Sequence, residues 1–139
     1  MDLSNFPNLA AEGYTIQSPC DAGYNCIAWA VDDYDKWWWP HPDEYWPVGV
    51  PVEVTVDAFV LAFGTLGYVE CKTSDFEAGC DKVALYTLDS EPTHAAKQID
   101  EQWWSSKIGS DEDILHTLDG LVSPDYGAVE LYLRREARP

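Results

Sequence analysis

The order in which hydrophobic patterns appear along the chain constrains its fold more than any other feature. Two helix-like segments come first. The apolar run 26–31 follows Asn25, a residue type that caps helix N-termini, and this predicts a helix of about ten residues beginning near Cys26. Thr55 precedes apolar side chains at 56, 59, 60 and 63, which is the spacing of one face of a second helix.

Strand-like segments follow these helices. Their ranges are 68–71, 82–87, 93–99, 103–108 and 129–133. A further short helix is predicted over 110–118, because acidic residues precede its apolar part and Gly120 follows it. Residues 1–23 are rich in Pro, Gly, Asn and Ser and indicate an extended lead-in. Helices followed by an antiparallel meander predict one α+β domain over residues 1–139, with N-terminal helices packed on the sheet.

Charge restricts the partners of such a domain. The 139 residues include 25 Asp and Glu but only 8 Lys and Arg, for a formal net charge of −17. A field of this sign repels phosphate backbones and anionic lipids, so we expect neither nucleic-acid nor membrane partners. A basic partner protein fits the charge, and so does a solvated acidic surface without a charged partner. The chain start lacks the pattern of a signal peptide, so a cytoplasmic location is expected.

The spacing of the cysteines argues against a metal centre. Cys20, Cys26, Cys71 and Cys80 form no Cys-x-x-Cys pair, and the histidines show no His-x-x-x-His spacing. We therefore predict no metal and no cofactor. Thiols stay reduced in the cytoplasm, and a bridge between Cys71 and Cys80, which flank a polar loop, is the alternative in an oxidising setting.

The most informative segment is the one around Cys26. A thiol at a helix N-terminus faces free N–H groups and the positive end of the helix dipole, which favour the thiolate that a nucleophile requires. His94, on a predicted strand that follows a turn, is the best candidate for its proton acceptor. The alternative is that Cys26 is a small core residue and His94 a hydrogen-bonded structural side chain.

Six phrases carry a resemblance to known domains. They are Tyr-Asn-Cys-Ile-Ala-Trp-Ala at 24–30, Trp-Trp-Trp-Pro at 37–40, Gly-Val-Pro at 49–51, Lys-Val-Ala-Leu-Tyr at 82–86, Thr-His-Ala-Ala at 93–96 and Ser-Lys-x-Gly at 106–109. With these phrases the chain resembles an uncharacterised bacterial domain family over about residues 18–134. In the order and spacing of its elements it also resembles, more distantly, the NlpC/P60-type branch of papain-like cysteine peptidases and amidases.

The NlpC/P60 resemblance implies further site residues. The third polar residue, which orients the imidazole, falls on Ser106, although Ser is unusual there; Gln98 and Gln102 are alternatives. Gln17 lies upstream of the cysteine, as the oxyanion glutamine does in papain. Asn25 is a second oxyanion candidate, with helix capping as its other role.

Aromatic side chains are concentrated just after the first predicted helix. Four prolines between 40 and 51 indicate an ordered loop there rather than a regular element. Three consecutive tryptophans cannot all face one side, so at least one is expected on a surface or cleft. We predict a substrate-binding wall beside Cys26, formed by Trp37, Trp38, Trp39 and Trp46, with plain packing of the loop as the alternative.

Two functional hypotheses follow. In the first, a papain-like cysteine hydrolase or acyl-transferase uses Cys26 to attack a peptide or other amide, with His94 carrying the proton and Ser106 orienting His94. In the second, the domain is a non-enzymatic binding module whose acidic surface and tryptophan loop meet a basic partner protein. The position of the Cys26 sulfur relative to the His94 imidazole distinguishes the two.

Overall fold

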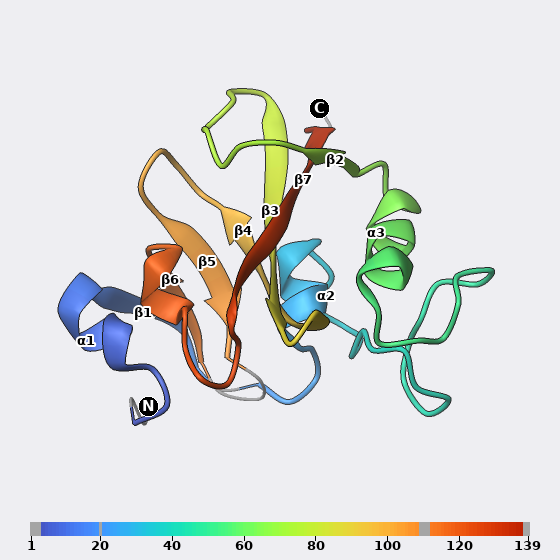
Figure 1. Cartoon of the computed structure of the whole chain (residues 1–139), viewed down its shortest axis with the longest axis horizontal. Coiled ribbons are helices and arrows are strands. Elements are labelled where there is room, and N and C mark those ends of the chain that lie inside the picture. The colour runs from blue at the N-terminus through green and yellow to red at the C-terminus, as the bar shows by residue number, and fades with distance from the viewer. Residues whose placement is uncertain (1–3, 20, 109–111, 138–139) are drawn as a thin grey trace.

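The computed structural model describes residues 4–19, 21–108 and 112–137 (Figure 1). The helices are α1 (Pro7–Glu12), α2 (Cys26–Ala30) and α3 (Val56–Gly64), with a 3-10 turn at Asp119–Leu121. The strands are β1 (Tyr14–Ser18), β2 (Val69–Cys71), β3 (Cys80–Leu88), β4 (Glu91–Gln98), β5 (Trp104–Lys107), β6 (Asp113–His116) and β7 (Ala128–Glu136). None of the helices in these ranges is long and apolar enough to cross a bilayer.

All named strands join one antiparallel sheet in the order β1-β6-β5-β4-β3-β7-β2. The predicted α+β class with an antiparallel sheet is therefore confirmed. The β3–β4 hairpin turns through Asp89 and Ser90, which both have positive φ (51° and 68°), the backbone that a tight two-residue hairpin requires. Figure 1 shows α1 beside the β1 end of the sheet and α3 beside the β2 end.

Side chains alternate across the sheet and supply two separate cores. Val83, Leu85 and Ala95 pack with α2 and α3 on one face. Ala84, Tyr86 and Ala96, their neighbours along the same strands, pack with α1 and the 3-10 turn on the other. The central strands β3 and β4 are therefore buried on both faces, and a side chain's place along them decides which core it joins.

The two predicted helix starts are confirmed by their caps. The side-chain oxygens of Asn25 and Thr55 accept hydrogen bonds from the backbone N–H groups of Ala28 and Ala58. However, α2 is shorter than expected. It ends at Ala30 because the chain turns at Asp32 into the left-handed region (φ 62°), where the Asp33 N–H donates back to the Ala28 carbonyl.

Two sequence predictions are wrong. Residues 1–23 are not an extended lead-in, since α1 and the edge strand β1 fold from them. The segment predicted as a helix over 110–118 forms the strand β6 where it is described, at 113–116, because it pairs with β1 and β5 on its two sides. Residues 110 and 111 lie outside the described ranges.

The suggested bridge between Cys71 and Cys80 is not formed. Both are free thiols on β2 and β3, and β7 runs between these strands. Neighbouring strands are about 4.8 Å apart, so positions two strands away are beyond the roughly 7 Å Cα separation that a disulfide tolerates. Cys20 lies outside the described residues.

Candidate functional site

A pocket opens at the start of α2, where the sequence placed the nucleophile. Its volume is about 290 Å³, and its lining residues are Asn25, Cys26, Trp37, Trp39, Thr93 and Tyr126. The lining is mostly apolar and comes from α2, the loop that follows it, the start of β4 and the turn before β7. Chain segments distant in the sequence thus meet here around a largely aromatic wall.

Asn25 fixes the geometry of this pocket. Its side-chain oxygen accepts hydrogen bonds from the N–H groups of Ala28 (3.2 Å) and Trp38 (3.0 Å), and its amide nitrogen donates to the Trp38 carbonyl (2.7 Å). One buried side chain therefore caps α2 and also ties the tryptophan loop to it. These bonds to the protein itself give Asn25 a structural role, in which one of its two amide N–H groups is used.

Cys26 is a buried thiol. The backbone N–H groups of Ala95, Ile27 and Cys26 itself face the sulfur and favour the thiolate, but desolvation outweighs them and raises the pKa of Cys26 to about 11. Lys107, which also faces this region, lowers the pKa only slightly. At neutral pH burial therefore favours the thiol over the thiolate that a nucleophile requires.

His94 lies on the opposite face of the sheet from Cys26. Its register partner is Tyr86, which belongs to the core beside α1, while the next residue, Ala95, packs with Cys26. The imidazole is fully buried, stacks on the Tyr126 ring at 4.2 Å and meets the Tyr86 ring edge-on at 5.4 Å. Within the described residues neither ring nitrogen has a hydrogen-bond partner, so no Cys26–His94 hydrogen bond exists here.

Ser106 does not orient His94. Its hydroxyl is hydrogen-bonded to Nε2 of His116 at 2.7 Å, and Nδ1 of His116 donates to the Thr117 carbonyl at 2.6 Å. Burial lowers the pKa of His116 to about 4, so its imidazole is neutral at physiological pH. The serine therefore serves a structural histidine within the sheet.

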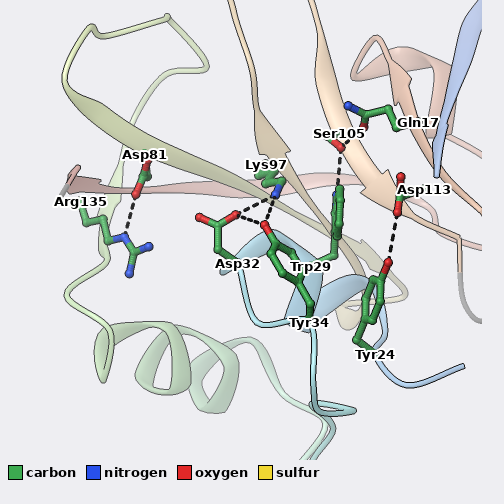
Figure 2. A network of polar contacts seen from close by, with 10 residues as sticks. All are labelled: Gln17, Tyr24, Trp29, Asp32, Tyr34, Asp81, Lys97, Ser105, Asp113 and Arg135. Carbon is green, nitrogen blue, oxygen red and sulfur yellow. Dashed lines mark hydrogen bonds and ion pairs between the residues drawn. The ribbon is translucent and has the colours of Figure 1, made fainter. Parts of the chain in front are cut away.

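The glutamines considered for the site also lie elsewhere. Gln17 accepts the Ser105 hydroxyl, which itself accepts the Trp29 indole N–H at 2.9 Å (Figure 2). Gln98 donates to the Ser74 carbonyl at 2.7 Å, and Gln102 is exposed in the β4–β5 turn. Gln17, Gln98 and Gln102 all lie outside the pocket lining.

The structure places only two of the four predicted tryptophans at the pocket. Trp37 and Trp39 line the pocket. Trp38 is buried in the core and donates its indole N–H to Asp33 at 2.9 Å. Trp46 packs on Phe59 and donates to the Pro51 carbonyl. Alternation along the loop thus sends the first and third tryptophans of the triplet to the pocket and the middle one inward.

Thr93 and Tyr126 are the pocket residues that sequence reasoning missed. The Thr93 hydroxyl donates to the Tyr126 carbonyl at 2.6 Å, and this bond joins the turn that carries Tyr126 to β4. The position of Thr93 could have been predicted from the sequence, because alternation along a strand places Thr93 and His94 on opposite faces of the sheet. Tyr126 had no such signal, since it lies on a turn whose position depends on the Ser123–Gly127 pairing.

A buried polar cluster lies on the same face as Cys26. Asp113 accepts the hydroxyls of Ser18 (2.7 Å) and Tyr24 (3.3 Å), and the Lys107 ammonium lies 5.2 Å from the Tyr24 ring. Asp113 and Lys107 are both fully buried. In the described ranges no three His, Cys, Asp or Glu side chains are grouped as metal ligands.

The four cationic side chains of the central strands gather at one end of the sheet. Lys82 near the start of β3, Lys97 near the end of β4, and Arg134 and Arg135 near the end of β7 share one end, because these strands are antiparallel. Each of the four is ion-paired. The pocket is at the other end, where exposed acidic side chains stand close in sequence to its lining: Asp35, Glu44, Asp89, Glu91 and Asp125.

None of these five carboxylates takes part in an ion pair of the described chain, and Lys36, which is next to Trp37 in sequence, pairs with Asp33. The ion pairs of the described chain involve Asp32, Asp33, Asp43, Glu77 and Asp81 instead. The pocket is therefore an apolar, aromatic recess whose neighbouring segments carry several acidic side chains without ion pairs.

Comparison with known proteins places the chain in a family without giving it an activity. Residues 15–134 match DUF7689, a domain family of unknown function, and the chain belongs to this family. No curated protein and no solved structure matches the chain. The membership in an uncharacterised family fits the sequence expectation, and the papain-like relationship stays a prediction.

Proposed function

We propose that this DUF7689 domain is a binding module that recognises a basic partner protein through the acidic, pocket-bearing end of its sheet. The observation that carries the proposal is the joint position of the aromatic pocket and the unpaired carboxylates at that end, with the paired Lys and Arg side chains at the other. Opposite charge attracts and orients a partner, while a recess lined by aromatic rings supplies the contact area that holds it.

The state of Cys26 and His94 supports binding rather than catalysis. A thiol-dependent hydrolase needs a thiolate and a nearby base. Here burial raises the pKa of the Cys26 thiol to about 11, and the His94 ring, on the other face of the sheet, stacks on Tyr126 and meets Tyr86 edge-on. On the pocket side, β4 presents Thr93 instead.

A cysteine hydrolase or acyl-transferase is the second candidate. It is favoured by one observation, namely that Cys26 reaches the pocket with backbone N–H groups of Ala95 and Ile27 around its sulfur. Such groups stabilise the anion formed when a thiolate attacks a carbonyl. This function requires a different arrangement of His94, or another base.

The binding proposal is tested with a synthetic basic polypeptide of alternating Lys and Arg, titrated into the protein by calorimetry at low and physiological salt. We expect binding that weakens with salt. Glu91→Lys with Asp125→Lys, at the pocket end, should weaken binding about tenfold more than the matched pair Glu70→Lys with Glu101→Lys, which makes the same change of net charge elsewhere. Equal losses in the two pairs, or no binding, would overturn the proposal.

A further inference from the structure

We infer that the pocket at the start of α2 accepts an arginine side chain of the basic partner. This inference rests on the proposed function and adds the identity of the inserted group. It comes from comparing two aromatic sites at opposite ends of α2, one of which the protein fills with its own lysine.

The filled site shows what this fold uses to hold an ammonium group. Lys97 Nζ lies 4.0 Å from the centre of the Trp29 ring and 5.3 Å from that of Tyr34. It also donates to Asp32 at 2.7 Å and to the Tyr34 hydroxyl at 3.2 Å (Figure 2). A compact, strongly hydrated ammonium thus receives a carboxylate and a hydroxyl in addition to the ring faces.

The pocket offers a different set of groups. Trp37 and Trp39 provide two aromatic side chains, Tyr126 also belongs to the lining, and no carboxylate is among the lining residues. The polar members of the lining are Asn25, whose amide is bound to the Trp38 backbone, the thiol of Cys26, and the Thr93 hydroxyl. An ammonium entering this pocket would lose its water without gaining a counter-ion in direct contact.

A guanidinium fits this environment better. It is planar and less strongly hydrated, it stacks on aromatic faces, and its charge is spread over three nitrogens. Its N–H groups at the mouth of the pocket can reach toward the rim, where Glu91 and Asp125 stand next to the lining residues in sequence. The volume of about 290 Å³ accommodates one side chain of this size.

The test uses single amino-acid probes that lack the long-range charge of a polypeptide. N-acetyl-arginine amide, N-acetyl-lysine amide and the neutral N-acetyl-norleucine amide are titrated into the intact protein, and the indole N–H signals are followed by NMR. We expect the arginine probe to bind about fivefold more tightly than the lysine probe and to shift the signals of Trp37 and Trp39. Norleucine should bind more weakly than arginine.

A variant pair separates this pocket from other exposed aromatics. Trp37→Leu should abolish the arginine preference, whereas Trp103→Leu, at a partly exposed tryptophan in another surface hollow, should keep it. The shifts in the unmodified protein test the site even if Trp37→Leu folds poorly.

The outcomes distinguish this inference from the proposed function. Equal binding of the arginine and lysine probes, tighter binding of norleucine, or shifts confined to Trp103 would overturn the arginine pocket. The binding-module proposal would survive each of these results if the basic polypeptide still distinguished the two charge-reversal pairs.

Discussion

Thr93 and His94 are neighbours on β4, yet they belong to different parts of the molecule. Thr93 lines a pocket open to solvent and fixes the position of Tyr126 by a hydrogen bond. His94 is fully buried behind the same tyrosine and has an imidazole without a polar partner in the described chain. The comparison teaches that a single step along a strand separates a surface accessible to a ligand from a side chain that only packs.

The largest expected effect of burying histidines, such as His94 behind Thr93, is a loss of folding stability at acidic pH. Burial lowers the pKa of His116 to about 4 and that of His94 well below its usual value, so both are neutral in the folded protein. The unfolded chain takes up protons near pH 6.5, so stability is full above that pH and falls as pH drops toward 4. His116 alone should cost about 3 kcal/mol of unfolding free energy over this range, measured by urea denaturation.

A matched pair of variants isolates the contribution of His94 to that pH dependence. His94→Phe removes one of the two buried histidines and should reduce the change of unfolding free energy between pH 6.5 and 4, leaving the contribution of His116. Thr93→Val, at the neighbouring position on β4, changes no titrating group and should keep the slope of the curve. An unchanged curve in His94→Phe would contradict the buried, neutral state of His94.

Replacing the His94 ring tests whether it stabilises the protein by packing alone. His94→Ala removes the ring that packs between Tyr86 and Tyr126 and should destabilise the protein by about 3 kcal/mol at pH 7.5. His94→Phe keeps an aromatic ring and breaks no hydrogen bond of the described chain, so it should lower the free energy of unfolding much less. Thermal and urea unfolding measure both; equal losses would show that the imidazole nitrogens have a role that packing does not explain.

Thiol labelling tests the state of Cys26 directly. A pKa of about 11 is two units above the ordinary value, which makes the thiolate about 100-fold rarer at neutral pH, and burial slows access further. Iodoacetamide should therefore label Cys71 and Cys80, which are partly exposed, before Cys26, as read by peptide mass mapping. Preferential labelling of Cys26 that slows in His94→Ala would instead favour the hydrolase.

The smallest expected effect concerns the two helix caps. Asn25→Ala breaks the cap of α2 and the two bonds to Trp38, whereas Thr55→Ala breaks only the cap of α3. We expect losses of about 2 and about 1 kcal/mol of unfolding free energy. Asn25→Ala should also weaken binding of the arginine probe, since the pocket depends on the position of the tryptophan loop. Thr55→Ala is its control.

Local signals in the sequence predicted the parts of the fold that depend on neighbouring residues. The helix starts at Cys26 and Val56 follow from their caps, and the long strands β3 and β7 from their β-rich composition. The strand β6 forms where the sequence predicts a helix, because four residues are too few to show the period of either element. Its state is decided by pairing with β1, which is distant in the chain.

The structure brings together only part of the site that the sequence predicts. Cys26 and two of the four tryptophans do meet at a pocket. The face of the sheet on which His94 lies could not be predicted from the sequence. The strand β4 is buried on both faces, and the segment Pro92–Ala96 shows no alternation of polar and apolar residues. Its facing is set by pairing with Tyr86, a contact across the sheet that no local pattern encodes.

The pairing of β1 with β6 has a consequence for how the domain is made. Ser18 on the edge strand meets Asp113, a residue 95 positions later. During synthesis, β1 therefore cannot pair until β6, its only neighbour in the described sheet, has been made. The five-residue helix α2 is too short to be stable by itself before then. We expect assembly to be late and all-or-none, so that ribosome-bound chains lacking β6 remain open to proteases along β1.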